Sequence, residues 1–227
     1  MTDLESSSNG VLRADEVTLT YQDGRNTVYA VKDVSLTIAA GEFVGILGPS
    51  GSGKTSLLYV LSGIRPPALG RVVLNGQLIN APGVSREAIR RRYFGFIFQQ
   101  FFLINYLSVL QNIVVGAARE DAETRARARA LVERIGLAGL ERRKPYELSA
   151  GQRQRVAIAR ALIKEPLVLL ADEPTANLDH TAGGTVMDML NETRGRSALV
   201  VVSHDETILQ RADSLYRMWD GELERVR

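Results

Sequence analysis

The chain has 227 residues, and its 28 Lys and Arg side chains against 26 Asp and Glu give a net charge of +2. This length fits one globular domain, or one domain with an inserted subdomain. With 45% hydrophobic and 24% charged residues, the composition excludes a disordered or collagen-like chain. No apolar run approaches the roughly 18 residues of a membrane span. The absence of cysteine excludes disulfides, thiolate zinc sites and thiol nucleophiles, and it fits a reducing cytosol.

We expect residues 11–227 to form this domain, behind a frayed tail at residues 1–10. The first part of the domain has an extended, β-rich pattern that is broken by the turn-forming residues Asp23, Gly24 and Asn26. The strands predicted here are residues 11–21, 29–38 and 42–47. The third strand runs through a glycine-rich segment into a predicted helix at residues 56–61.

From about residue 85 the pattern becomes helical, with many Arg and Ala residues. The helices predicted in this part are residues 87–92, 109–116, 122–135 and 151–163. Residues 85–165 contain 16 Lys and Arg but only 8 Asp and Glu. This basic excess belongs either to solvated helix faces or to a surface for a partner. We expect residues 85–165 to form a helical subdomain inserted in an α/β core.

The last third of the chain alternates short apolar strands with helices. Residues 167–171 form an unbroken apolar run, which is typical of a strand buried on both faces. The further elements predicted here are a helix at residues 180–193, a strand at 198–202, a final helix, and a hairpin at 215–226. This alternation predicts an α/β fold with a mostly parallel sheet flanked by helices, next to an antiparallel β subdomain at the N-terminus.

One motif indicates the chemistry of this core. Residues 48–55 fit G-x-x-x-x-G-K-T between a predicted strand and a predicted helix, the context that a phosphate-binding loop requires. Glycines let successive backbone N–H groups point at phosphate oxygens, and the helix N-terminus adds a positive dipole end. Lys54 is expected to meet the β- and γ-phosphates, and Thr55 to bind Mg²⁺ through a hard oxygen. The motif predicts a P-loop NTPase core with these phosphate-binding residues: Gly48, Pro49, Ser50, Gly51, Ser52, Gly53, Lys54 and Thr55.

Two carboxylates follow the apolar run, at the carboxyl end of a predicted buried strand. There Asp172 can hold the Mg²⁺ shell, and Glu173 can polarise water as a general base. His204 follows another predicted core strand, so it is expected to reach the same crevice. His180 opens a helix, and we expect it to be a solvated helix-start residue.

A second helix start in the chain also suits an anion. Ser149 and Gly151 lie at the beginning of the Arg-rich helix, where free N–H groups favour negative charge. The alternative is that Ser149 only caps its helix and meets no ligand. If both phosphate-binding helix starts serve one nucleotide, they have to come from different copies of the chain.

Together and in order, these motifs resemble those of the ATPase subunit of an ATP-binding cassette (ABC) transporter, from about residue 12 to residue 221. Residues 48–55 are similar to Walker A, residues 167–173 to Walker B with its catalytic Glu, and residues 148–152 to the family signature. Gln99 resembles the Q-loop residue, His204 the switch histidine, and residues 176–179 the D-loop. Tyr21 resembles the aromatic residue that stacks on adenine. The further nucleotide-binding residues implied by the resemblance are Ser56, Ser149, Ala150, Gly151, Gln152, Asp172 and Asp179.

The resemblance also implies cofactors and catalytic roles. ATP is the nucleotide, and Mg²⁺ is held by Thr55, Gln99 and Asp172. The catalytic residues that it implies are Lys54, Gln99, Glu173 and His204.

The partners implied are a second copy of the chain and separate transmembrane permease subunits. In the homodimer, Ser149 of one copy closes on the γ-phosphate held by Lys54 of the other. The permease subunits dock on the helical subdomain, at the cytoplasmic face of the cell membrane. The apolar stretch at residues 101–106 either lines the docking groove or is ordinary subdomain core. Nucleic acid is not expected as a partner, because ABC ATPases that act on it usually carry two cassettes or a long coiled coil.

Residues 94–99 and the D-loop resemble the branch that includes lipoprotein-release, macrolide-efflux, haem-efflux and cell-division ATPases. This implies a subunit that powers the export or extraction of an amphiphilic substrate such as a lipoprotein, drug, haem or peptide. The alternative is a regulatory ATPase of cell division or envelope remodelling that moves no cargo. The signature departs from the family pattern at Ala150, where Gly is usual; a Cβ is tolerated there if φ is negative.

Overall fold

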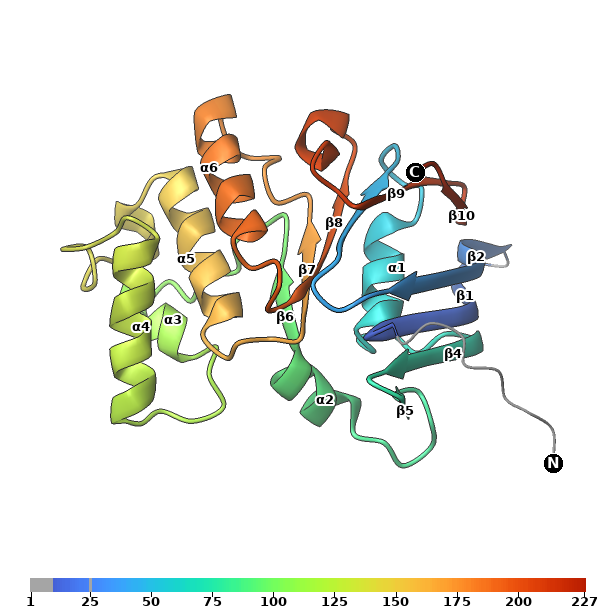
Figure 1. The fold of residues 1–227 in the computed structure, drawn as a ribbon, viewed down its shortest axis with the longest axis horizontal. Coiled ribbons are helices and arrows are strands. Elements are labelled where there is room, and N and C mark those ends of the chain that lie inside the picture. Colours follow the sequence, from blue (N-terminus) through green and yellow to red (C-terminus); the bar gives the residue numbers. More distant parts are fainter. Residues whose placement is uncertain (1–9, 25) are drawn as a thin grey trace.

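The computed structural model describes residues 10–24 and 26–227, so the tail predicted at residues 1–10 lies outside the described residues apart from Gly10. The elements form three parts that lie side by side (Figure 1). An antiparallel sheet has the strand order β2-β1-β4-β5, and a central sheet has the order β10-β9-β3-β8-β7-β6. A group of helices lies on the far side of the central sheet from the antiparallel sheet.

The antiparallel sheet contains two strands that the sequence predicts and two that have no counterpart among the predicted elements. The predicted hairpin is confirmed: β1 (Leu12–Asp23) and β2 (Asn26–Ile38) pair along their lengths, and Asp23 lies opposite Asn26. On the other side of β1, β4 (Leu69–Leu74) places Leu74 opposite Leu12. The short β5 (Gln77–Leu78) completes this sheet.

The central sheet is parallel except at one edge. The parallel strands are β3 (Phe43–Leu47), β6 (Phe94–Ile97), β7 (Val168–Asp172), β8 (Ala198–Ser203) and β9 (Ser214–Trp219). The edge strand β10 (Glu222–Arg225) pairs antiparallel with β9. Every residue of β7 and β8 is buried, as expected for apolar strands covered on both faces. Because parallel strands share one carboxyl edge, the residues after β3, β7 and β8 lie next to one another.

Helices cover both faces of the central sheet. Between the two sheets lies α1 (Lys54–Leu61), in the same hydrophobic cluster as Ile89 of α2 (Arg86–Tyr93). The fully buried side chains of α1 are Leu57, Leu58, Val60 and Leu61. On the opposite face, α6 (His180–Asn191) and the 3₁₀ helix η2 (Glu206–Leu209) pack against the sheet. Burying each of these leucines stabilises the fold by about 1.5–3 kcal/mol, which anchors α1 and the loop before it.

The helical layer consists of α3 (Val109–Val114), α4 (Ala122–Arg134), the 3₁₀ helix η1 (Pro145–Glu147) and α5 (Ala150–Leu162). α3, α4 and α5 share a third hydrophobic cluster. The segment predicted as a helical subdomain, residues 85–165, is not helical throughout, because residues 94–97 form β6 and pair with β7 in the central sheet. The limits of the subdomain stay a prediction, with α3 to α5 as its helical part. Among the described helices, none has the length and apolar content that a membrane span needs.

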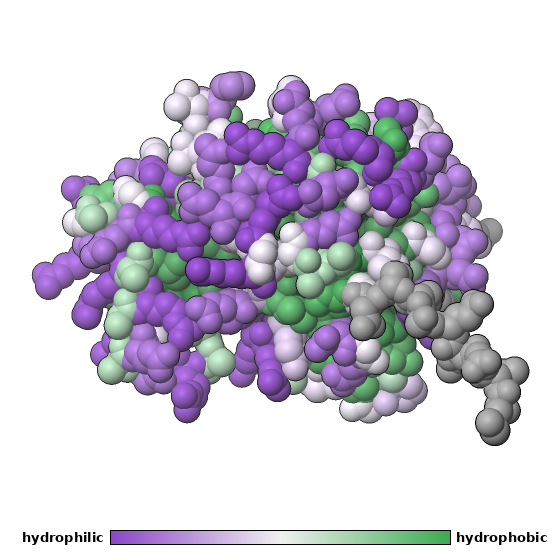
Figure 2. Space-filling view, viewed as in Figure 1, coloured by the Kyte–Doolittle hydropathy of each residue, from purple (hydrophilic) through white to green (hydrophobic). Residues whose placement is uncertain are grey.

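Much of the basic charge of α4 is paired with nearby carboxylates at the surface. The ion pairs are Arg125–Glu120 at 2.7 Å, Arg127–Glu123 at 3.0 Å and Arg134–Glu192 at 3.0 Å. Figure 2 shows a largely hydrophilic surface over α4 and α5. Exposed pairs of this kind stabilise a fold by only about 0.2–1 kcal/mol each. The arrangement favours solvated helix faces over a dedicated basic surface.

A buried amide fixes the loop that leads into the helical layer. Asn112 of α3 is fully buried, and its Oδ1 accepts from the N–H of Ile104 at 2.8 Å. Its Nδ2 lies 3.1 Å from the carbonyl oxygens of Ile104, Leu107 and Ser108. The side chain therefore ties residues 104–108 to α3.

We expect Asn112→Ala to lower the free energy of unfolding by about 2–3 kcal/mol, because it leaves buried backbone groups of this loop without their partner. Urea unfolding followed by circular dichroism measures the change. Asn105→Ala is the control, since Asn105 is exposed in the same loop, and we expect a change within about 0.5 kcal/mol. Equal effects of the two substitutions would contradict the role of the buried amide.

Candidate active site

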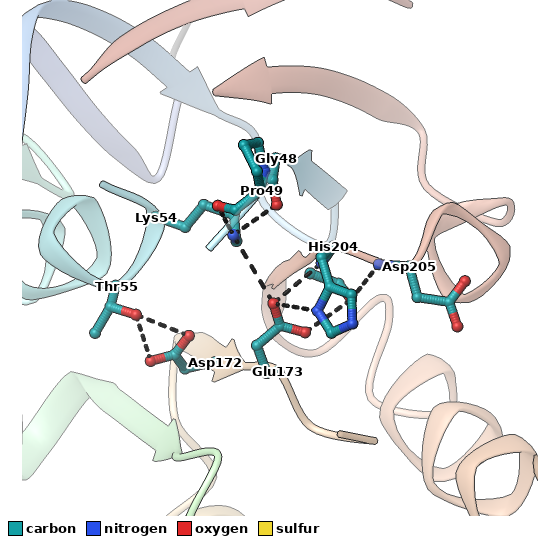
Figure 3. A network of polar contacts seen from close by, with 9 residues as sticks. Gly48, Pro49, Lys54, Thr55, Asp172, Glu173, His204 and Asp205 are labelled. Carbon is teal, nitrogen blue, oxygen red and sulfur yellow. Dashed lines mark hydrogen bonds and ion pairs between the residues drawn. The ribbon is translucent and has the colours of Figure 1, made fainter. Parts of the chain in front are cut away.

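Polar side chains converge where the parallel strands end (Figure 3). Lys54 begins α1, directly after the glycine loop that follows β3. Asp172 is the last residue of β7 and Glu173 follows it, while His204 follows β8. The structure thus brings together the predicted residues of the glycine loop, the acidic pair and the strand-end histidine.

Lys54 is only 6% exposed, and the loop that precedes it holds its ammonium group. Nζ donates to the carbonyl oxygens of Gly48 at 2.7 Å and Pro49 at 2.8 Å, and it lies 3.8 Å from Oε1 of Glu173. Burial lowers the pKa of Lys54, while the negative charges of Glu173 and Asp172 oppose that shift. A buried cation therefore lies within the loop and next to a carboxylate.

Thr55 and Asp172 form a pair across α1 and β7. The Thr55 hydroxyl donates to the carboxylate, with Oδ1 at 3.1 Å and Oδ2 at 2.9 Å. Asp172 is 7% exposed, and burial is the main cause that raises its pKa; the bond from Thr55 lowers it and the charge of Glu173 raises it further. In the part of the chain that the structure describes, no group of three or more His, Asp and Glu side chains could hold a metal ion. The hydroxyl and carboxylate oxygens of the pair are hard donors, which suit a cation that takes further ligands from a substrate or water.

Glu173 is held at both carboxylate oxygens. The Ser203 hydroxyl donates to Oε2 at 3.0 Å, and the backbone N–H of His204 donates to Oε1 at 3.0 Å. Nδ1 of His204 lies 3.0 Å from the same Oε1. The backbone of Glu173 has a φ of +45°, which is uncommon for a residue with a side chain, and its N–H bonds to Val202 at 3.0 Å. The carboxylate thus lies between buried Lys54 and a histidine whose side chain is 60% exposed.

The residues of the signature lie apart from this cluster, at the N-terminus of α5. The Ser149 hydroxyl accepts from the N–H of Gln152 at 3.3 Å, and Oε1 of Gln152 accepts from the N–H of Ser149 at 2.9 Å, which is a capping box. Ala150 is the first residue of α5 and is not among the residues with positive φ, so its Cβ is tolerated. Ser149 is exposed and Gly151 is half-buried. Among the described residues, no hydrogen bond or ion pair joins this helix start to Lys54.

Tyr21 and Gln99 lie at two further places. The Tyr21 hydroxyl is 3.5 Å from Oγ of Ser56 in the first turn of α1, on the side of the antiparallel sheet. Gln99 is exposed, and its backbone carbonyl accepts from Nδ2 of Asn177 at 2.9 Å. This bond ties the loop after β6 to the loop after β7.

Asp179 and His180 form the start of α6. The carboxylate of Asp179 accepts from the N–H of Ala182 at 2.9 Å and so caps the helix. His180 is exposed at the first helical position, as expected for a solvated residue.

Two polar side chains that support the site have no counterpart among the predicted site residues. The hydroxyl of Ser203 bonds Glu173. The sequence feature that could have indicated this role is a polar residue at the end of an apolar strand. Gln154 is 1% exposed, and its Nε2 donates to the carbonyl of Pro174 at 2.8 Å. Its signal is a polar residue on the apolar face of a helix, with Ile158 one turn later.

A parallel sheet whose first strand runs through a G-x-x-x-x-G-K-T loop into a helix, with an acidic pair at the end of a nearby strand, defines a P-loop nucleoside triphosphatase. The family model for the ABC transporter matches residues 31–176, and the chain belongs to this family. Expectations of the fold class, the family and ATPase activity are therefore confirmed, and the chain is an ATP-binding ATPase of ABC transporters.

Relatives and solved structures narrow the position within the family. The lipoprotein-releasing system ATP-binding protein LolD of Acinetobacter baylyi is 42% identical over 218 residues, which are 93% of this chain and 96% of that protein. The macrolide export ATP-binding/permease protein MacB of Chromobacterium violaceum is 40% identical over 96% of this chain, which spans 35% of that protein. A dimeric structure of the ATP-binding cassette MJ0796, in a post-hydrolysis state bound to ADP and Pi, has a TM-score of 0.83 and 37% identity, covering 95% of this chain and 99% of that one. The resemblance to the lipoprotein-release and macrolide-efflux branch is confirmed.

Thr55→Val should destabilise the metal-free protein by about 1–3 kcal/mol, because the hydroxyl of Thr55 is the one side chain among the described residues that donates a hydrogen bond to the buried carboxylate of Asp172. Thr55→Ser keeps the hydroxyl and is the matched control, for which we expect a change of less than about 1 kcal/mol. Urea unfolding in the presence of a chelator measures both. A valine variant as stable as the serine variant would show that this hydrogen bond does not stabilise Asp172.

Proposed function

We propose that two copies of the chain bind ATP and Mg²⁺ between them and hydrolyse the ATP to power the export or extraction of an amphiphilic substrate by separate transmembrane subunits. The observation that carries this proposal is the cluster at the glycine loop, in which buried Lys54 and Asp172 contact half-buried Glu173 and Thr55. In this proposal the chain acts at the cytoplasmic face of the cell membrane, held there by the transmembrane subunits.

Thr55 and Asp172 hold Mg²⁺ in this proposal, with Gln99 as a further ligand. Their hydroxyl, carboxylate and amide oxygens are hard donors that fit this ion. The burial of the Asp172 carboxylate supports the assignment, because a cation beside it offsets the cost of removing its charge from water. When bound, Mg²⁺ neutralises charge on the β- and γ-phosphate oxygens.

The chain's own residues divide the remaining chemistry. Lys54 binds the β- and γ-phosphates, exchanging loop carbonyls for phosphate oxygens in charge-assisted hydrogen bonds. Glu173 accepts a proton from the attacking water at its carboxylate. Ser203 and the backbone of His204 keep that carboxylate in one orientation, and the His204 imidazole stays beside Oε1, next to the position of the water.

The base and the second copy complete the nucleotide site. Tyr21 stacks on adenine, and its contact with Ser56 supports this because it lies next to the helix that follows the phosphate loop. Ser149 and Gly151 of one copy close on the γ-phosphate held by the other copy. The dimeric state of the related MJ0796 structures supports this arrangement.

A groove between the central sheet and the helical layer is the proposed docking place for the transmembrane subunits. Phe96, Phe98 and Val115 line it together with the basic Arg160 and Lys164. Outside it, the predicted apolar stretch contributes two outward side chains, Phe102 at 59% and Tyr106 at 78% exposure. Phe102 packs edge-on against Phe98 of the groove, and an exposed aromatic residue beside a groove with aromatic walls is typical of an interaction surface.

The substrate class is proposed from the relatives. LolD is named for lipoprotein release and MacB for macrolide export, and both kinds of molecule combine apolar and polar parts. The chain spans 96% of LolD and 35% of MacB, whose name joins an ATP-binding and a permease part. LolD is named as the ATP-binding protein of a releasing system, and this likeness supports permease subunits as partners.

Glu173→Gln should lower ATP turnover by roughly 10²- to 10⁴-fold, because the amide cannot accept the proton of the attacking water. Steady-state phosphate release measures turnover, and calorimetric titration with Mg²⁺ and ATP should show binding within a few-fold of the unmodified chain. Turnover that is unchanged in this variant would refute the proposed role of Glu173.

The Glu173→Gln chain should form a dimer when Mg²⁺ and ATP are added, because ATP that is not hydrolysed keeps the two copies together. Analytical ultracentrifugation measures the mass. Adding Ser149→Arg should leave a monomer that still binds ATP, because the bulky side chain blocks closure by the second copy.

The matched control for this test is Ser108→Arg. Ser108 caps α3 with the same capping box through Gln111, so its substitution costs a helix cap without touching the proposed interface. We expect the Ser108→Arg variant to dimerise. Loss of the dimer in both variants, or in neither, would contradict the role of Ser149.

A further inference from the structure

The turn of the C-terminal hairpin is bonded to the phosphate loop and to β2 at the same time. The backbone N–H of Gly221 donates to the carbonyl of Ser52 in the glycine loop at 3.0 Å. The carbonyl of Gly221 accepts from the N–H of Lys32 in β2 at 2.8 Å. Nζ of Lys32 lies 2.8 Å from Oδ2 of Asp220. Asp220 and Gly221 therefore connect the phosphate loop to β2, although the turn is distant from both in the sequence.

A β-bulge in β2 brings the antiparallel sheet against the same loop. Leu19 lies opposite Val31 and Thr20 opposite Tyr29, so Ala30 is an extra residue without a partner in β1. The carbonyl oxygen of Ala30 lies so close to Gly53 that a Cβ there would overlap it. The bulge, the glycine loop and the hairpin turn are thus in direct backbone contact.

We propose that the Asp220–Gly221 turn is a positioning element for nucleotide binding, which holds the phosphate loop at a fixed distance from the strand pair that carries Tyr21. The inference rests on the proposed stacking of adenine on Tyr21. ATP meets both parts at once, with its phosphates on the loop and its base on the strand pair. ATP binds more tightly when the phosphate loop and the strand pair already lie at the right distance from each other, because binding then does not have to order them.

A second hairpin in the chain has a similar turn, but its backbone bonds Val11 next to β1 and not the phosphate loop. Asn75 and Gly76 join β4 to β5 with φ values of 48° and 78°, and Asp220 and Gly221 join β9 to β10 with φ values of 45° and 82°. A Cβ on Gly76 would have no neighbour within 4 Å, whereas a Cβ on Gly221 would lie 3.0 Å from the carbonyl oxygen of Tyr29. Both turns have positive φ at both residues, but only the glycine of the Asp220–Gly221 turn has close neighbours.

The test compares Gly221→Ala with Gly76→Ala in the Glu173→Gln chain, where bound ATP persists. Calorimetric titrations use ATP and inorganic tripolyphosphate as probes, each with Mg²⁺. For Gly221→Ala we expect Kd for ATP to rise by about tenfold and Kd for tripolyphosphate by less than about threefold, because only ATP meets both parts. For Gly76→Ala we expect both constants to stay within about twofold, although both variants carry the cost of an alanine at positive φ.

Three results would overturn the inference: ATP affinity unchanged in Gly221→Ala, an equal loss with Gly76→Ala, or an equal loss for ATP and tripolyphosphate. A parent chain that binds no ATP would instead refute the proposed function, so the two failures are distinguishable. Circular dichroism establishes that each variant is folded.

A milder variant keeps the inference testable if Gly221→Ala does not fold. Asp220→Gly keeps the turn intact, since Gly-Gly suits a two-residue hairpin. The substitution removes the ion pair with Lys32. By charge alone, removing an anion near the phosphates strengthens ATP binding. We expect ATP binding to weaken instead by about twofold or more, because only the backbone bond to Lys32 then ties the turn to β2. Stronger ATP binding in this variant would overturn the inference.

Discussion

The burial of Lys54 beside two carboxylates is the interaction on which the rest of the structure depends. An ammonium group that is 6% exposed needs close partners, because removing its charge from water is costly. Two carbonyls of the glycine loop and the carboxylate of Glu173 supply them. These partners come from the ends of β3 and β7, which lie on either side of β8. The strand order of the central sheet is therefore a condition for the charge balance of the site.

Long apolar patterns and turn residues predict much of this fold. The run before Asp172 predicts a buried strand, and that strand lies between β8 and the edge strand β6 with every residue buried. β6 has only four residues and follows α2 without a turn residue, so no local signal separates it from the helical segment around it. β4 begins at Leu69–Gly70, directly after a proline-rich stretch, and has no strong strand pattern there. Its position in the sheet is set by its pairing with β1. Short strands of this kind depend on tertiary contacts more than on propensity.

The sequence predicts a site residue well when its chemical type and spacing define its role. It predicts a residue less well when the role depends on the orientation of the side chain. The glycine loop, Asp172 and Glu173 follow from residue type and spacing, and the structure brings them within hydrogen-bond or ion-pair distance. Ser203 escapes prediction because its role depends on which way its hydroxyl faces at the end of β8. Within one chain Ser149 bonds its own helix, so both readings of this residue, cap and ligand, agree with the same geometry.

Gln154 links the two regions that serve different nucleotides in the proposed dimer. It lies in α5, five residues after the N-cap Ser149, and its buried amide bonds the carbonyl of Pro174, the residue after Glu173. A shift of α5 therefore strains or moves the backbone next to Glu173, because a buried amide that loses its partner costs about 1–3 kcal/mol. In the proposed dimer α5 meets the second copy and Glu173 meets the water, so this hydrogen bond links the two places within one chain. In that dimer, a contact that moves α5 at one nucleotide also acts on the backbone next to Glu173 at the other.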